Sequence, residues 1–329
     1  MDDFKQLCRQ NGYNEFQRKD YTDETTIRRF LRAQRNDVHA AFRQFQESQK
    51  WRRAHDIRGF YEGLDVNAYD ETRKMEQNPQ WTGRRDRDGR PIYVYQVREI
   101  TKNKLDGYFK MLERAQRPPN HSKPDVPIHI LHFHALYENL LQFTFPLASE
   151  LPRPDPEHET AASTHIVDIS NVSLVQFWNI RRYLQDASRI GTDFYPETLA
   201  RVFVVGAPVF FRTIWDVASQ WFAPDTRSRI SIVSSSDLKP SLLSQIDATD
   251  LPQEYGGEIE WQWGDPPNLD SPTKKLVDEL YHKSERDEVF SKGPIIYEDG
   301  CIRLLGSEDG SPRRNSFCHN QNYHRDCQE

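Results

Sequence analysis

The sequence predicts an α/β fold in which a small helical bundle precedes a parallel-rich sheet with helical crossovers that form a pocket. Two observations predict this fold. The first 70 residues are polar with apolar residues at helical spacing, whereas after Trp81 short β-branched and aromatic runs alternate with segments of helix length. We expect a helical N-terminal domain at 1–70, a pocket-forming α/β domain at 71–262 and a polar tail at 263–329.

The N-terminal domain is expected to contain two main helices. Thr22 or Asp23 can cap the first, ETTIRRFLRAQ, whose apolar residues follow i, i+3, i+4 spacing. Asp37 can cap the second, VHAAFRQFQESQKWRR. Helices this short bury little surface alone, so they are expected to pack as a bundle against the rest of the chain.

The α/β domain is expected to open with a strand after a turn. Asp88-Gly89 is a turn signal, and the following PIYVYQV alternates as a strand does. Residues 103–127 are polar and interrupted by prolines, which favours a connecting loop. Later strands, including the doubly buried VFVV, are expected at 163–169, 200–208 and 229–235, and helices at 128–148, 173–190, 213–222 and 241–246.

The tail is expected to be mostly disordered, with one short helix near 273–284. Within it, Arg313-Arg314-Asn315-Ser316 has the form of a basophilic kinase site. The chain has four cysteines (Cys8, Cys301, Cys318 and Cys327), too few and too scattered for a disulfide scaffold. We therefore expect reduced thiols in a cytosolic protein.

Composition limits the classes of partner. The start MDDFKQLCRQ lacks the apolar core of a signal peptide, and the sequence has no run of 18 apolar residues. We expect a soluble cytoplasmic protein, a monomer, whose membrane contact is peripheral and transient. A net charge of −6 argues against nucleic-acid binding.

Motifs for catalysis are missing from the sequence. It has no G-x-S-x-G elbow, no Walker A loop and no G-x-G-x-x-G, so we expect no enzyme, and a lipid hydrolase is the disfavoured alternative. The histidines His129, His132 and His134 lack a carboxylate or cysteine at ligand spacing, so no metal is predicted there. The polar tail also has ligating residue types, at Cys318, His319, His324 and Cys327.

A set of charged and polar residues is the strongest candidate for a binding site. Arg52 and Arg53 end a predicted helix, where solvated arginines are common. Glu197 follows a proline, and Thr226 and Arg229 flank the start of a strand. Their spacing alone does not establish that they converge.

Several ordered stretches between about Asp23 and Gly257 resemble the CRAL-TRIO lipid-binding family, specifically the fungal phosphatidylinositol/phosphatidylcholine transfer proteins. The matching stretches are IRRFLRAQRNDVHAAFRQFQESQKWRR, DRDGRPIYVY, VDIS, FYPETLARVFVVGAP, APDTRSRI and LPQEYGG. The resemblance implies a lipid carrier that exchanges phosphatidylinositol between cytoplasmic membranes, or presents it to a lipid kinase, without catalysis.

The resemblance also implies roles for individual residues. The inositol phosphate would be held by Arg52, Arg53, Glu197, Thr226 and Arg229. The phosphatidylcholine site would use Tyr93, Tyr137, Ser163 and His165. Here the chain departs from the family pattern, because His165 stands where a threonine is expected and Thr82 where a third tyrosine is expected. The second ligand is therefore left open between phosphatidylcholine, another lipid, a sterol and haem ligated by His165.

A gate is expected at the amphipathic helix near VFFRTIWDVASQWF. Its aromatic residues either enter the lipid interface or cover the core: Phe210, Phe211, Trp215, Trp221 and Phe222. The family's gate is flanked by two glycine hinges. Gly257 matches one hinge, and Ala200 stands at the other.

Overall fold

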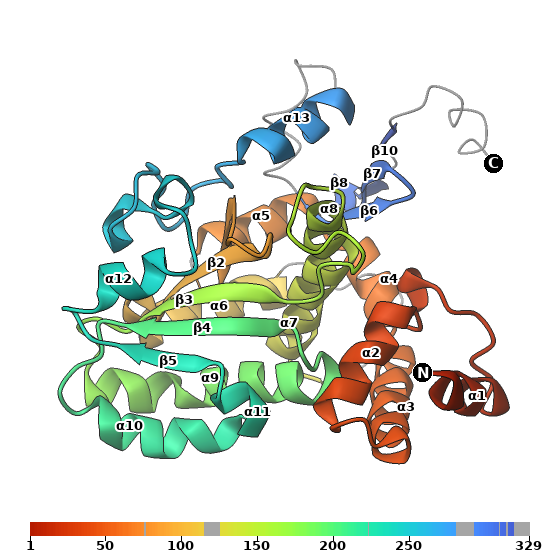
Figure 1. The fold of residues 1–329 in the computed structure, drawn as a ribbon, viewed down its shortest axis with the longest axis horizontal. Coiled ribbons are helices and arrows are strands. Elements are labelled where there is room, and N and C mark those ends of the chain that lie inside the picture. Colours follow the sequence, from red (N-terminus) through yellow and green to blue (C-terminus); the bar gives the residue numbers. More distant parts are fainter. Residues whose placement is uncertain are drawn as a thin grey trace.

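A mixed five-stranded sheet organises the molecule, as predicted (Figure 1). The computed structural model describes residues 1–75, 77–114, 126–222, 224–280, 293–308, 310–313 and 315–318. The strands follow the order β1 (Gln80–Arg85), β2 (Pro91–Gln96), β3 (Ser163–Asp168), β4 (Leu199–Val205) and β5 (Ile230–Val233). β1 and β2 pair antiparallel across the predicted Asp88-Gly89 turn, and each later neighbour pairs parallel.

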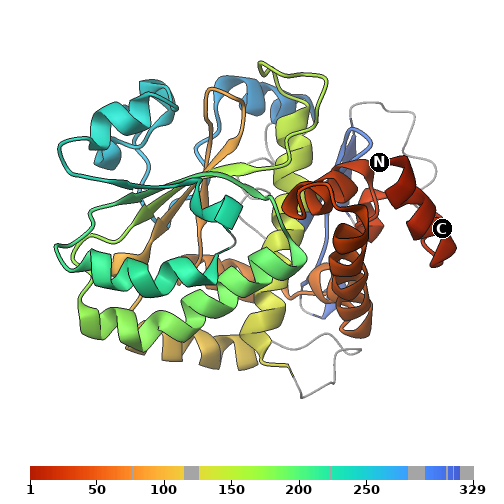
Figure 2. The ribbon, with the colours of Figure 1, turned by 60° about the horizontal axis from the view of Figure 1, so that its bottom comes forward.

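The two faces of the sheet belong to different hydrophobic clusters, because successive side chains of a strand point to opposite faces. Ile92, Val94 and Ile166 pack against the segment 238–261. That segment contains α12 (Leu238–Leu243), η5 (Ala248–Asp250) and η6 (Gln253–Tyr255). Tyr93 and Val202 belong to the larger cluster, on the face that the long helices cover (Figure 2).

The helices of the large face include two that the sequence did not predict, α6 (Lys102–Arg114) and the short α11 (Pro224–Arg227). The others are α7 (Ile128–Asn139), α8 (Phe145–Ser149), α9 (Leu174–Phe194) and α10 (Phe211–Ala218), with short turns η2 (Val97–Glu99) and η4 (Ser219–Trp221). A π-helical turn, η3 (Leu140–Thr144), joins α7 to α8. The expectation of a loop at 103–127 is wrong for α6, where Leu105, Tyr108 and Leu112 are buried at helical spacing.

The N-terminal residues form the predicted helical bundle. Its elements are α1 (Asp2–Gln10), η1 (Arg18–Asp20), α2 (Glu24–Ala33), α3 (Val38–Ala54), α4 (Ile57–Glu62) and α5 (Val66–Lys74). Asp23 caps α2 by accepting a hydrogen bond from the backbone N–H of Thr26, and Asp37 caps α3 through Ala40. Phe30 and Phe45 are fully buried in the bundle's own core.

The expectation of a mostly disordered tail is wrong for the described residues after 262. The predicted short helix is α13 (Ser271–Leu280). It is followed by an antiparallel sheet of order β10-β7-β6, built from β6 (Ile295–Glu298), β7 (Cys301–Leu304) and β10 (Asn315–Cys318), and by the small pair β8 (Ser307–Glu308) and β9 (Ser311–Pro312). The three-stranded sheet buries Ile295, Tyr297 and Ile302 against Phe143 and Leu147. The sequence did not predict these strands because they are short and are interrupted by glycines and charged residues, so their apolar residues show no sustained alternation.

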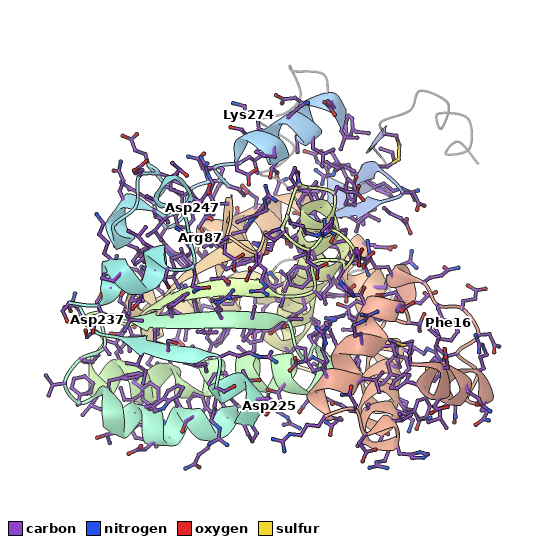
Figure 3. All side chains as sticks on the ribbon, in the orientation of Figure 1. Phe16, Arg87, Asp225, Asp237, Asp247 and Lys274 are labelled. Carbon is purple, nitrogen blue, oxygen red and sulfur yellow. A yellow bond between two sulfur atoms is a disulfide. The ribbon has the colours of Figure 1, made fainter. Side chains whose placement is uncertain are left out.

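Cys301 and Cys318 form a disulfide between facing positions of β7 and β10 (Figure 3), so the expectation of reduced thiols is wrong for this pair. Cys8 is a buried free thiol. Ser316 lies on β10 opposite Arg303, and the guanidinium of Arg313 donates to the carbonyls of Leu305 and Pro294. The tail residues His319, His324 and Cys327 lie outside the described residues.

Removing the disulfide is expected to destabilise the C-terminal sheet by about 3 kcal/mol, because the bond closes a loop of 17 residues. In parent protein, a dithiol reductant should speed hydrogen exchange of the β7 and β10 amides. In the double variant Cys301→Ala/Cys318→Ala, hydrogen exchange of these amides should already be fast without reductant, and adding reductant should not speed it further. Equal exchange rates in parent and double variant without reductant would contradict this expectation.

Candidate functional site

An apolar cavity of about 250 Å³ lies between the sheet and the helices of its large face. The sheet contributes Trp81, Tyr93 and His165, and α7 with η3 contributes Tyr137 and Phe143. The remaining lining residues come from α5, α7, η3, α9, the sheet with its flanking residues and the C-terminal segment: Tyr69, Thr72, Asn78, Pro79, Gln80, Tyr95, Phe133, Leu136, Asn139, Leu140, Ala187, Thr198, Leu199, Asp265, Pro267, Gly293 and Ile295. The walls suit a hydrophobic ligand, because only a few polar atoms interrupt them.

The polar residues of this cavity include three of the four predicted for a second lipid, and the fourth, Ser163, contacts one of them. The ring of Tyr93 stacks on that of His165 with centroids 5.2 Å apart, and its hydroxyl donates to Thr144 Oγ1 at 3.2 Å. His165 Nε2 lies 2.9 Å from Ser163 Oγ. Tyr137 stacks on Tyr195 at 4.2 Å. Burial lowers the pKa of His165 to about 4, so its ring is neutral at physiological pH.

Thr82, the other departure from the family pattern, is fully buried. Its hydroxyl donates to the carbonyl of Ile92 at 3.1 Å. Thr82 is not among the described residues that line the cavity, whereas its neighbour Trp81 is.

Arg52 is buried in an ion pair that the sequence did not predict. Its Nη1 donates to Glu138 Oε1 at 2.5 Å and to the Tyr195 hydroxyl at 2.9 Å, and its guanidinium lies 3.8 Å from the ring centroid of Tyr21. Burial disfavours the charge, but Glu138 outweighs it and holds the pKa of Arg52 above its ordinary value. The stacked ring of Tyr195 then joins this pair to the cavity residue Tyr137.

Arg53 points elsewhere. It is exposed, and its guanidinium lies 4.7 Å from the ring centroid of Tyr13. Both arginines border a surface groove of about 460 Å³ beside the 12–22 loop. Within the described ranges, no hydrogen bond or ion pair joins Arg52 or Arg53 to the other predicted headgroup residues.

The remaining headgroup candidates lie together. Arg229 Nη2 donates to Glu197 Oε2 at 2.5 Å, while its Nη1 donates to the carbonyl of Leu199. Glu197 has φ +62°, a left-handed conformation that costs a non-glycine residue roughly 1–3 kcal/mol. Thr226, on α11, accepts a bond from the Arg229 backbone N–H through its carbonyl. Next to it, Asp225 (labelled in Figure 3) pairs with Arg35 of the N-terminal bundle at 3.2 Å.

The predicted gate aromatics turn toward the protein. Phe211 is buried, and Phe210, Trp215 and Trp221 pack against the large core, while Phe222 is half-buried. In the part of the chain that the structure describes, none of the five lines the cavity. The exposed large apolar residues are instead Leu174, Val175, Trp178, Val209 and Ile232.

The three histidines of α7 face different partners. His129 Nε2 lies 3.4 Å from Asp186, His132 Nδ1 lies 2.7 Å from the Tyr108 hydroxyl, and His134 Nδ1 lies 2.7 Å from Tyr195. In the described ranges, no group of three or more His, Cys, Asp or Glu side chains is arranged to hold a metal ion.

Stability should fall below pH 6.5 because His132 and His134 are buried as neutral rings. Burial lowers the pKa of His132 from 6.5 to about 4 and that of His134 well below 6.5. As the pH falls, these histidines therefore take up protons in the unfolded chain before they do so in the folded one. Their contribution to the free energy of unfolding is fully present above pH 6.5 and is lost below it, by at most about 1.4 kcal/mol per pH unit for each ring. Urea unfolding between pH 8 and 5 measures this slope. His132→Gln should reduce it, and an unchanged slope in that variant would contradict the assignment.

Sequence reasoning missed Glu138, Tyr195 and Ile295. His134 and Glu138 are four residues apart on one helix, a spacing that places both on one face, but nothing local identifies Arg52 as their partner. Within the described ranges, no helix has the length and apolar character needed to cross a membrane.

Comparison with known proteins agrees with the resemblance. The profile of the CRAL/TRIO domain matches residues 75–257. The SEC14 cytosolic factor of Yarrowia lipolytica is 28% identical over 272 residues, covering 83% of this chain and 50% of that protein. The SEC14 cytosolic factor of Kluyveromyces lactis is 26% identical over 260 residues, covering 79% of this chain and 77% of that protein. The Arabidopsis thaliana phosphatidylinositol/phosphatidylcholine transfer protein SFH7 is 30% identical over 230 residues, covering 70% of this chain and 38% of that protein.

The lengths of these relatives differ from that of this chain, which spans half of the Yarrowia protein and about three quarters of the Kluyveromyces one. The profile match extends over more than half of the 329 residues and includes all four strands of the parallel part of the sheet. The chain therefore belongs to the CRAL/TRIO domain family.

Proposed function

We propose that this protein binds phosphatidylinositol and exchanges it between cytoplasmic membranes without catalysis. The observation that carries the proposal is the apolar cavity of about 250 Å³, bordered by aromatic rings and a few polar groups. The names of its relatives, cytosolic factors and a phosphatidylinositol/phosphatidylcholine transfer protein, support the lipid class. In this proposal the protein acts as a monomer, and the lipid that it presents is available to a lipid kinase.

Loading such a lipid requires the cavity to widen. Ligand pockets typically measure roughly 300–1,000 Å³, so a cavity of about 250 Å³ is below that range. Burying acyl chains favours the pocket over water by about 0.8 kcal/mol per CH₂, but the competing state is a bilayer, where the same chains are already buried. Contacts to the headgroup and the free energy of opening must then select the lipid.

We place the headgroup at Glu197, Thr226 and Arg229, and leave out Arg53, which borders the separate groove beside the 12–22 loop. Arginine matches phosphate oxygens with paired donors, and Glu197 can accept bonds from inositol hydroxyls. The strained backbone of Glu197 and its bond to Arg229 support this choice. Arg52 would act differently: its bond to Tyr195 positions the ring that stacks on Tyr137.

Native mass spectrometry of co-purified lipid tests the headgroup site. Arg229→Ala should lose bound phosphatidylinositol at least tenfold relative to parent, because a charge-assisted bond is worth about 1.5–3 kcal/mol. Arg227→Ala is the matched control, an exposed arginine two residues earlier, at the end of α11. Equal retention of phosphatidylinositol in the parent and in both variants would overturn the headgroup assignment.

The second ligand is a separate proposal. Tyr93, Tyr137 and His165 border one cavity, and Ser163 contacts His165, which supports phosphatidylcholine through the tyrosine rings. A sterol or haem is the alternative, and the imidazole of His165 on the cavity wall is the observation that favours haem. Purified protein with a Soret band that His165→Ala abolishes would favour haem, and colourless protein with co-purified phosphatidylcholine would favour the lipid.

We propose that the exposed apolar residues around the carboxyl ends of the parallel strands contact the membrane. Leu174 and Val175 begin the helix after β3, and Val209 follows β4, so these residues share the carboxyl edge of the sheet, the edge at which Asp237 follows β5 (Figure 3). Because the predicted gate helix α10 begins at the same edge, contact there would bring the bilayer to the gate.

Val175→Asp/Trp178→Asp should weaken binding to phosphatidylcholine vesicles that contain phosphatidylinositol by tenfold or more. Burying one such side chain is worth about 1.5–3 kcal/mol. The control, Gln10→Asp/His39→Asp, adds the same charge on the exposed surface of the N-terminal helices. Co-sedimentation measures the binding, and equal losses in the two double variants would indicate a charge effect without insertion.

A further inference from the structure

The C-terminal sheet forms part of the cavity wall, although it lies outside the region that matches the family profile. Gly293 and Ile295 line the cavity, and so do Asp265 and Pro267 of the preceding segment. The profile match ends at residue 257. In Figure 1, β6 and β7 lie beside α8, at the end of the helices that bound the cavity.

The side chain of Ile295 packs within a hydrocarbon cluster at this wall. It is 6% exposed and shares the cluster with Phe143 of η3, which also lines the cavity. Trp81 packs against the same cluster and also borders the cavity, with its ring 6.4 Å from that of Phe143. A ligand portion at this wall would therefore meet aliphatic and aromatic carbon.

The backbone of Ile295 is fixed independently of its side chain. The Tyr61 hydroxyl donates to the Ile295 carbonyl at 2.9 Å and accepts from its N–H at 3.0 Å. Asn139 Nδ2 donates to the same hydroxyl at 3.2 Å. Tyr61 is 1% exposed, so water does not compete for these bonds. A substitution at Ile295 should thus change the volume of the cavity without releasing the strand.

We infer that β6 determines which acyl chains the cavity accepts, with Ile295 as the specificity-determining residue. This inference rests on the proposed lipid function. In the described residues the wall is supplied by the C-terminal sheet and not by α10, so the limit on chain length comes from a segment outside the profile match. A larger side chain at position 295 should restrict the cavity to shorter acyl chains, and a smaller one should admit longer acyl chains.

The test compares acyl-chain composition of co-purified phospholipid, by native mass spectrometry and lipid extraction, across three variants. Ile295→Ala removes three side-chain carbons and should shift the bound lipid toward chains longer by about two to three carbons. Ile295→Trp should shift it toward shorter chains or reduce occupancy severalfold. Ile302→Ala is the matched control, since Ile302 is fully buried in the same cluster on β7 but does not line the cavity.

The outcomes separate the two proposals. Parent-like chain composition in Ile295→Ala and Ile295→Trp, with lipid still bound, would overturn the role of Ile295 and leave the lipid function intact. The same chain shift in Ile302→Ala would overturn it as well, because the effect would then follow from loosened packing. Absence of any phospholipid from parent protein would overturn the lipid function, and this inference with it.

Discussion

Arg52→Ala should lower the free energy of unfolding by about 3–5 kcal/mol, which is the cost of leaving the partner of a buried ion pair unpaired. Glu138 is 1% exposed, and the substitution removes its salt bridge to Arg52. The substitution also removes the donor to the Tyr195 hydroxyl and the cation over the ring of Tyr21. Urea unfolding at pH 7 measures the difference.

Arg53→Ala is the control, because Arg53 is the next residue of the same helix but is exposed. Its substitution should change stability by at most about 0.5 kcal/mol. The double variant Arg52→Met/Glu138→Leu should recover most of the loss, since it removes both charges. A loss below 1 kcal/mol for Arg52→Ala would show that Glu138 finds another partner or water.

The expected instability of Arg52→Ala affects how lipid-binding data for this variant should be interpreted. A protein with Arg52→Ala that lacks phosphatidylinositol could have lost it through the altered position of Tyr195 and Tyr137 alone. Substitutions at Arg229, which is partly exposed, separate the loss of a headgroup contact from the loss of the fold.

Gly257→Ala should destabilise the protein by about 3 kcal/mol or more, the upper range for overpacking a site that cannot yield. A Cβ at this position would lie 1.9 Å from the carbonyl oxygen of Leu251 and 2.4 Å from its carbonyl carbon. That carbonyl also accepts the backbone N–H groups of Glu258 and Ile259, so it is held in place. Close approach of two backbone segments, and not a positive φ, explains the glycine.

Gly107→Ala is the matched control. Gly107 lies within α6, and an added Cβ would meet only Met75 Cε, at an ordinary 3.7 Å. This substitution should raise the free energy of unfolding by about 0.5–1 kcal/mol, the helix propensity of alanine over glycine. Thermal unfolding should move in opposite directions for the two variants, and a neutral Gly257→Ala would mean that the 248–259 segment shifts easily. The predicted role of Gly257 as a gate hinge stays a prediction.

The parts of the fold that follow from local signals could be predicted from sequence. Asp23 and Asp37 cap their helices because a short side-chain oxygen before a helical pattern has one favourable place to bond. The runs around Ile166 and Phe203 read as buried strands because both faces of the parallel sheet are covered. The family resemblance, confirmed by the profile match, supplied the order of these elements.

The rest depends on pairings between distant residues. Arg52 has a surface-like sequence context, and its burial follows only from Glu138, 86 residues later. The C-terminal sheet is stabilised by a disulfide and by hydrogen bonds to Tyr61, which no local pattern encodes. The sequence did not predict helix α6 because its apolar residues stand in a charged segment that is followed by several prolines.

The π-helical turn η3 has a consequence for insertions and deletions. It carries Phe143, which lines the cavity, and Thr144, whose hydroxyl accepts from Tyr93, and it passes directly into α8. A π-helical turn holds one residue more than an α-helical turn, so deleting one residue of η3 would restore α-helical winding and leave the later residues near their present orientation. Deleting a residue of α7 instead would turn every later residue of the helix by about 100°, with a shift of about 1.5 Å. Substitutions leave this winding unchanged. The orientation of Leu147 and of the surface on which β6 rests should thus tolerate the loss of one residue in η3, but not in the α-helical turns before it.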